Sequence, residues 1–403
     1  MDSRLQSRVT LDRQASLTSA TALLGVLYAG SPLVTPLYPL YQRAFALSEL
    51  MVTLIYAAYV IGNLGATFLF GRVSDQAGRR PVSLLMLAIA MVSTLLFLFA
   101  TGPAWLFVAR AASGLAIGVG AATATAWITE LHPGNDAAPA SRLAAAINLA
   151  GLAAGALLAG LLAQFAPAPL HTVFVVYLTI LAAMAALTAL SRETVQQRVR
   201  SIGKLSLDFH VGVPADLRVP FITPAVTAFA TFSLLGFYAA LLPNLLENSM
   251  HEHSPALSGA VVAELFATSA ITVVATSALA ARAAMRTGLW LLPPSLALLL
   301  WAQAAGSLAL LILATAVCGV ACALGFRGSL QEANRMAPAE RRAELLSAYL
   351  LCCYTGNSLP VVGIALLSRF AGHFWANATF SAISVVLAAI ALAVDRRQPS
   401  LRR

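Results

Sequence analysis

Long apolar runs separated by short polar and charged segments dominate the sequence. Each run is close to the roughly 20 residues that an α-helix needs to cross a bilayer. Apolar and polar residues do not alternate within the runs, so the pattern predicts membrane-spanning helices rather than the strands of a membrane barrel. Twelve runs can be marked, at 17–41, 49–70, 81–101, 104–128, 141–165, 170–190, 221–246, 256–281, 288–303, 306–327, 344–369 and 373–394.

The runs form two sets of six that echo each other at an offset of about 200 residues. Pro39 near the end of the first run corresponds to Pro243 near the end of the seventh, and Glu130 after the fourth corresponds to Glu332 after the tenth. Such repeats predict an all-α membrane protein with twelve transmembrane helices in two six-helix bundles and a site between them. The expected domains are an N-terminal bundle at 1–190, a cytoplasmic linker at 191–220 and a C-terminal bundle at 221–403.

Composition and charge agree with a membrane protein and give its expected orientation. Hydrophobic residues make up 59% of the chain and charged residues 10%, a balance suited to lipid. All but three of the 25 Lys and Arg residues (Arg43, Arg110 and Arg369) fall in alternate loops and the termini. The positive-inside rule then places both termini in the cytoplasm, and we expect a bacterial inner-membrane protein. The same asymmetry explains the net charge of +9 without nucleic acid as a partner.

A loop motif follows the second run. Gly71 and Gly78 permit tight backbone geometry there, while Arg79 and Arg80 hold the loop on the cytoplasmic side. Asp75 is an acid in a basic loop, and it could accept hydrogen bonds from the N-terminus of a neighbouring helix. Such a contact would be a latch that forms in one transport state and breaks in the other.

This loop resembles the signature between the second and third helices of the major facilitator superfamily. The resemblance implies the two-bundle fold and transport by alternating access. Gln76 departs from the pattern, since the family often has Arg there, and part of the usual charge network is then missing.

Arg110 lies about six residues into the fourth run, roughly 9 Å from its outer end. An arginine at this depth is costly unless it faces a cavity or a partner. The stretch from Leu106 to Gly114 resembles the fourth-helix motif of the drug:proton antiporters of the superfamily, in which the arginine influences protonation of a nearby acid. The alternative is an arginine that snorkels to the outer interface.

The fifth run carries Gly151, Gly155 and Gly160, and it resembles the antiporter signature of that helix, with Ala156 and Ala159 in place of Pro and Gly. This resemblance favours export. Close packing against a neighbouring helix is the simpler explanation of the glycines.

Two acid and base pairs, Glu130 with Arg142 and Glu332 with Arg341, resemble the cytoplasmic gates of the same group. Solvated loop charge is the alternative interpretation of these four residues.

Glu264 is the one acid well inside an apolar run. Burial disfavours the charged form of a carboxyl, so this group could bind and release a proton during transport. The alternatives are a glutamate held neutral by a static hydrogen bond and a position near the outer mouth.

Aromatic and amide residues of the central runs are candidates for the substrate cavity: Tyr28, Asn148, Phe232, Tyr238, Gln303, Tyr354 and Asn357. Cys318, Cys322, Cys352 and Cys353 lie in apolar runs and are interpreted as reduced core residues rather than metal ligands. We expect no metal and no cofactor.

These features predict a secondary active transporter that exports a small neutral, amphipathic or anionic molecule in exchange for protons, with Glu264 carrying the proton and Arg110 tuning the site. The alternatives are a proton-coupled importer of a metabolite and a membrane ligand sensor that does not transport. The absence of a phosphate-binding glycine loop or catalytic cluster argues against an enzyme. The expected partners are membrane lipid, the substrate and protons, and we expect a monomer.

Overall fold

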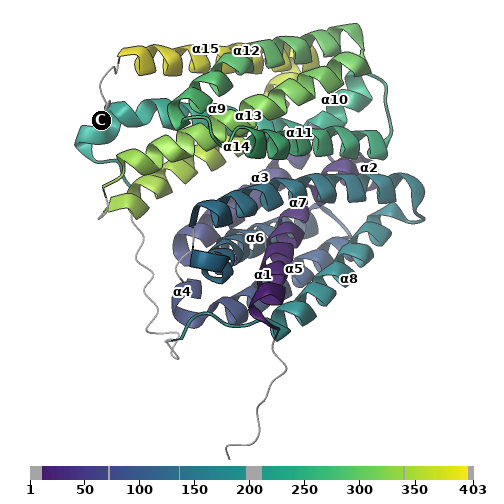
Figure 1. The fold of residues 1–403 in the computed structure, drawn as a ribbon. Coiled ribbons are helices and arrows are strands. Elements are labelled where there is room, and N and C mark those ends of the chain that lie inside the picture. Colours follow the sequence, from purple (N-terminus) through teal and green to yellow (C-terminus); the bar gives the residue numbers. More distant parts are fainter. Residues whose placement is uncertain (1–10, 71–72, 136, 197–210, 339–340, 398–403) are drawn as a thin grey trace, which may run out of the picture.

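The computed structural model describes the chain except for residues 1–10, 71–72, 136, 197–210, 339–340 and 398–403. Within the described residues, twelve helical segments are long and apolar enough to cross a membrane. The predicted all-α fold with twelve transmembrane helices is therefore confirmed. Figure 1 shows the two groups of helices, with the first half of the chain (purple to teal) beside the second half (green to yellow).

The first half contains six spans, the first of which is broken into three pieces. Its elements are α1 (Arg13–Ala29), η1 (Pro32–Leu37), α2 (Tyr38–Phe45), α3 (Glu49–Phe70), α4 (Val73–Ala77), α5 (Arg79–Leu98), α6 (Pro103–Leu131), η2 (Pro133–Asn135), α7 (Ala137–Phe165) and α8 (Pro169–Leu190).

The second half repeats this arrangement. Its elements are η4 (Ala215–Leu217), α9 (Arg218–Ala240), α10 (Leu242–Ser249), α11 (Pro255–Ala275), α12 (Ala281–Ala305), α13 (Leu308–Met336), α14 (Arg342–Ala371) and α15 (His373–Arg397).

Proline explains why the first and seventh spans are interrupted at matching places. Pro32 and Pro36 lie in η1, where their missing N–H groups favour a 3₁₀ turn over a continuous α-helix. In the seventh span, α9 ends at Ala240 and α10 begins again with Pro243 in its first turn. The break in the first span exposes backbone carbonyls that the candidate site uses.

The prediction for the ninth run was too short. Residues 288–303 were marked, but α12 extends from Ala281 to Ala305 and includes Pro293 and Pro294. Buried helices tolerate such prolines because neighbouring groups satisfy the freed carbonyls. Arg282 and Arg286, which precede the marked run, lie in the first two turns of α12, where both contact the buried carboxylate of Asp395.

The two bundles meet along two pairs of helices, α7 with α11 and α3 with α14. One end of this interface carries α2 and α10, and α4 lies at the opposite end (Figure 1). We call the first the clasp end, because Arg43 and Glu247 join the bundles there, and the second the basic end, because Arg79 and Arg282 lie there.

Candidate functional site

Arg110 is buried in the first bundle, with none of its surface exposed. Its Nη1 donates to the Ser31 carbonyl at 2.9 Å, and its Nη2 donates to the Tyr38 hydroxyl at 2.5 Å. Ser31 can accept because the helix of the first span stops at Ala29. The snorkelling alternative is therefore wrong, since the guanidinium is turned toward the broken first span.

Tyrosine rings surround this guanidinium. Its central carbon lies 5.5 Å from the ring centroid of Tyr38, 5.7 Å from that of Tyr59 and 6.0 Å from that of Tyr56. Tyr41 is also near enough to interact electrostatically with the Arg110 guanidinium. We call Arg110 with Tyr38, Tyr41, Tyr56 and Tyr59 the arginine cage.

Sequence reasoning missed these four tyrosines. The available signal was their spacing, since two pairs three residues apart place both rings of each pair on one helical face.

Four predicted cavity residues gather beside the cage. Tyr28 lies next to Asn148, and Asn357 lies next to Tyr56. Tyr354 is close to both Tyr28 and Tyr59. Because these residues come from α1, α7 and α14, they draw on both bundles at their interface. A fifth, Phe232, packs edge-on against Tyr354 with ring centroids 6.1 Å apart.

The other two predicted cavity residues do not belong to this group. Gln303 is buried near the clasp end of α12, where its amide donates to Ser249 Oγ and accepts from Asn377 Nδ2, both at 3.0 Å. It ties together three helix ends. Tyr238 is buried in the core of the second bundle and accepts a hydrogen bond from Thr315 at 3.1 Å.

Glu264 lies near the middle of α11 and is partly buried. Its side chain is close enough to Tyr238 to act on it electrostatically. Within the described part of the chain, no hydrogen bond or ion pair involves its carboxylate. The static hydrogen bond considered above is therefore not formed, and Glu264 and Arg110 are not paired with each other.

At the basic end, Arg79 connects the loop after the second span to the end of the fourth. Its guanidinium contacts Glu130 at 2.6 Å, Asp75 at 2.5 Å and Ser74 Oγ at 2.7 Å, and the residue is only 6% exposed. Glu130 therefore pairs with Arg79, not with Arg142 as predicted, and Arg142 is exposed.

The helix N-terminus in this loop is capped by Glu193, not by Asp75. The Glu193 carboxylate accepts from the backbone N–H groups of Arg79 at 2.9 Å and Arg80 at 3.1 Å. Asp75 instead pairs with Arg79 in its own loop. Gly78, with a φ of 108°, makes the turn into α5 that an L side chain would strain. Gly71 lies outside the described residues.

The second bundle carries a matching cluster around Asp395. Its buried carboxylate accepts from Arg282 Nε at 2.8 Å and also contacts Arg286. Asp395 lies in the last turn of the twelfth span, while Glu193 lies just after the sixth, and Arg282 lies at the start of the ninth span as Arg79 does at the start of the third. The predicted pair of Glu332 with Arg341 is wrong, since Glu332 pairs with Arg335 and Arg341 pairs with Glu344, each within one helical turn.

Hydrogen bonds cross between the bundles at four places at the clasp end, and His373 adds a contact to Glu49 at 3.4 Å. Thr35 donates to the Ala239 carbonyl at 2.7 Å and Arg43 pairs with Glu247 at 2.5 Å, and both pairs join residues 204 positions apart. The other two are Ser254 with Gln164 at 3.1 Å and Ser368 with Glu49 at 3.4 Å. Corresponding positions of the two halves therefore meet around one axis, and we call these four contacts the clasp.

The fifth-helix glycines act in two different interfaces. Gly151 and Gly155 lie against Gly25 and Ala29 of α1, within the first bundle. Gly160 faces α11 across the interface, where a Cβ would lie 2.9 Å from the Cα of Gly259. The three glycines allow close helix packing, as the simpler explanation proposed, and one of them packs the bundles together.

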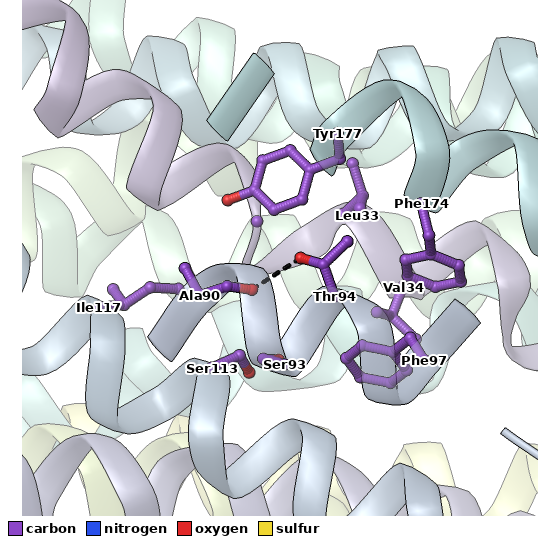
Figure 2. A pocket seen from close by; sticks show the side chains of 11 residues that line it. Leu33, Val34, Ala90, Ser93, Thr94, Phe97, Ser113, Ile117, Phe174 and Tyr177 are labelled. Carbon is purple, nitrogen blue, oxygen red and sulfur yellow. Dashed lines mark hydrogen bonds between the residues drawn. The ribbon is translucent and has the colours of Figure 1, made fainter. Parts of the chain in front are cut away.

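Figure 2 shows a small cavity inside the first bundle, beside the broken span. Its volume of about 20 Å³ holds about one water molecule. Thr94, Ser93 and Tyr177 on its wall already donate to the carbonyls of Ala90, Ala109 and Val26. The cavity is too small and its polar groups too well satisfied for a substrate site.

The cysteines are free thiols, three of them buried. The described residues contain no cluster of His, Cys, Asp and Glu that could hold a metal ion.

Two repeated six-helix bundles around a polar and aromatic centre are the architecture of a secondary transporter. Residues 20–291 match the family model of the Major Facilitator Superfamily, and the chain belongs to that family. It is a transporter rather than an enzyme. Among curated protein sequences, none is similar enough to this chain to count as a relative.

Solved structures share the fold at low identity. A transporter of the POT family, in complex with 5-aminolevulinic acid, is 14% identical with a TM-score of 0.76, over 96% of each chain. A bacterial homolog of the human lysosomal transporter Spinster, in an inward-facing, unoccupied conformation, is 16% identical with a TM-score of 0.72, over 95% of this chain and 96% of that one. The human organic anion transporter MFSD10 is 16% identical with a TM-score of 0.68, over 95% and 100%.

Proposed function

We propose that the protein is a proton-coupled exporter of a small molecule in the bacterial inner membrane. The observation that carries this proposal is Glu264, an acid near the middle of a spanning helix whose carboxylate has no hydrogen-bond partner among the described residues. An unpartnered carboxylate at this depth favours its neutral form, and it can ionise only when water or a partner reaches it. Such a group can carry a proton from one side of the membrane to the other.

The arrangement of contacts supports an inward-facing state. The clasp closes one end, while Asp75 and Arg341 at the other end pair with Arg79 and Glu344 of their own bundles. If the basic end lies in the cytoplasm, as the loop charges favour, the substrate path opens toward the cytoplasm. Both termini then lie in the cytoplasm, and residues 1–190 and 221–403 move as the two domains.

Glu264→Gln is expected to abolish gradient-driven transport while leaving folding intact. Glutamine keeps the size of the side chain but cannot bind or release a proton. The measurement is substrate movement in proteoliposomes under an imposed pH gradient, using neutral, anionic and cationic compounds.

Glu252→Gln is the matched control, because Glu252 is an exposed acid in the loop just before α11. Full transport by Glu264→Gln would contradict the proton-carrying role. Substrate transport that does not depend on the pH gradient would indicate a uniporter or another coupling ion. Transport of substrate in the same direction as protons would make the protein an importer.

Asp75→Asn is expected to impair transport with little loss of stability. The side chain is 55% exposed, and an exposed ion pair contributes at most about 1 kcal/mol. In the proposed cycle, Asp75 leaves Arg79 when the basic end closes and accepts hydrogen bonds at the start of a helix of the other bundle. Thermal unfolding and initial transport rates check this together, and an unchanged rate would exclude the latch.

A further inference from the structure

No negatively charged side chain among the described residues pairs with Arg110. In the described part of the chain, its guanidinium contacts a carbonyl, a hydroxyl and three aromatic faces, and no carboxylate pairs with it. The first bundle offers no acid inside its apolar runs to fill this role. A buried charge without a counter-charge destabilises the protein strongly unless a ligand supplies one.

Two buried donors at this place also lack partners. Arg110 Nε and the Tyr41 hydroxyl make no hydrogen bond to the described residues, although both are shielded from solvent. Tyr41 is one of the groups on which the charge of Arg110 acts. A guanidinium with a free N–H beside a free phenol is suited to bind an anion, because charge-assisted hydrogen bonds are the strongest kind.

We propose that Arg110 and Tyr41 bind the carboxylate of the substrate, so that the transported molecule is a small organic anion. This inference rests on the proposed function and narrows its substrate class. Phe232 and the partly exposed rings of Tyr28 and Tyr354 lie close by and offer apolar faces to the rest of the molecule. The cage and these neighbouring rings together favour an amphipathic carboxylate over an inorganic anion.

The position of the cage connects binding with the clasp. Tyr38 and Tyr41 lie on α2, the short helix that also carries Arg43 of the clasp. Thr35, another clasp residue, lies one turn before Tyr38. Opening the clasp must move two rings of the cage, so the carboxylate site changes as the transporter changes state.

The test measures binding by the purified full-length protein in detergent. Radiolabelled benzoate, phenylacetate and hexanoate are compared with their uncharged amides, by equilibrium binding and by thermal unfolding. We expect at least one carboxylate to bind and to raise the unfolding temperature while its amide does not. Arg110→Gln should weaken that binding about tenfold or more, and Tyr41→Phe should weaken it severalfold.

The stability of Arg110→Gln without ligand shows whether Arg110 is a binding residue or a structural residue. Without a carboxylate present, Arg110→Gln should be at least as stable as the parent, because an uncompensated buried charge has been removed. Arg369→Gln, at an exposed arginine near the clasp end, is the matched control and should change neither measurement.

Equal behaviour of all three carboxylates and their amides would overturn the inference. So would an Arg110→Gln variant that is destabilised yet keeps full affinity. If carboxylates bind but proteoliposomes move no compound, the proposed function is wrong and the carboxylate site stands. If neutral or cationic compounds are transported and carboxylates neither bind nor compete, the carboxylate site is wrong and the proposed transport function stands.

Discussion

Replacing Arg79 by glutamine is expected to destabilise the protein by about 2–3 kcal/mol and to abolish transport. The guanidinium is almost fully buried and holds Glu130, Asp75 and Ser74 at once. Its loss leaves two carboxylates without their cation at the basic end of the first bundle. The estimate lies below the roughly 3–5 kcal/mol usual for a broken buried pair, because solvent partly screens both carboxylates.

The consequence extends beyond one ion pair. Glu130 also accepts from Thr194, and Glu193 beside it caps the first turn of α5. Arg13 donates to the carbonyls of Leu131 and His132 just after Glu130. Arg79 and Arg13 are thus the two cations of a cluster that joins the starts and ends of four spans.

Arg80→Gln is the matched control. Arg80 is the next residue in the chain, but among the described residues its side chain makes one long contact of 3.4 Å, to the Ala189 carbonyl. Its replacement should change stability by less than about 0.5 kcal/mol. Thermal unfolding in detergent and transport in proteoliposomes compare the two variants, and equal effects would show that charge in the loop matters more than the Arg79 cluster.

The sequence predicted the fold because its signal is local. A run of some 20 apolar residues becomes a spanning helix whatever its neighbours are. The depth of Arg110 and the position of Glu264 in the middle of a span could be read in the same way. The breaks in the first and seventh spans were visible as Pro36, Pro39 and Pro243, although their effect on Ser31 was not.

The sequence did not predict which charged side chains of different helices pair with each other. Glu130 was paired with Arg142 because both follow the fourth span, but the cation that reaches it comes from the loop after the second. Asp395 lies just past the twelfth marked run, where nothing in the sequence indicates that it is buried between Arg282 and Arg286. Which face of a helix meets which neighbour depends on packing, and no local pattern encodes it.

The clasp contacts follow the internal repeat of the chain. Thr35 with Ala239 and Arg43 with Glu247 join positions that correspond under the offset between the halves. A contact between corresponding positions lies on the symmetry axis, as in an isologous dimer interface. The bundles can rock about this line with the clasp closed, which opens the basic end without separating the halves.

Replacing Gly160 by valine is expected to open the clasp end. A Cβ at this position would lie 2.7 Å from the Pro255 carbonyl oxygen and 2.9 Å from the Cα of Gly259. Both are backbone atoms of α11, so no side chain can move aside and the helices must separate. The clasp contacts of Ser254 and Gln164 lie within one or two turns of this point and should break with it.

Spin labels at Gln42 and Asn248, which line the hollow at the clasp end, report the change as a distance distribution. The valine variant should shift the distribution to longer distances and lower the transport rate, because the inward-facing state is destabilised against the outward-facing one. Gly363→Val is the matched control, since nothing lies within 4 Å of its Cβ position on α14. An unchanged distance distribution in a folded Gly160→Val protein would mean that α7 and α11 tolerate the added volume, and that the clasp does not depend on their close approach.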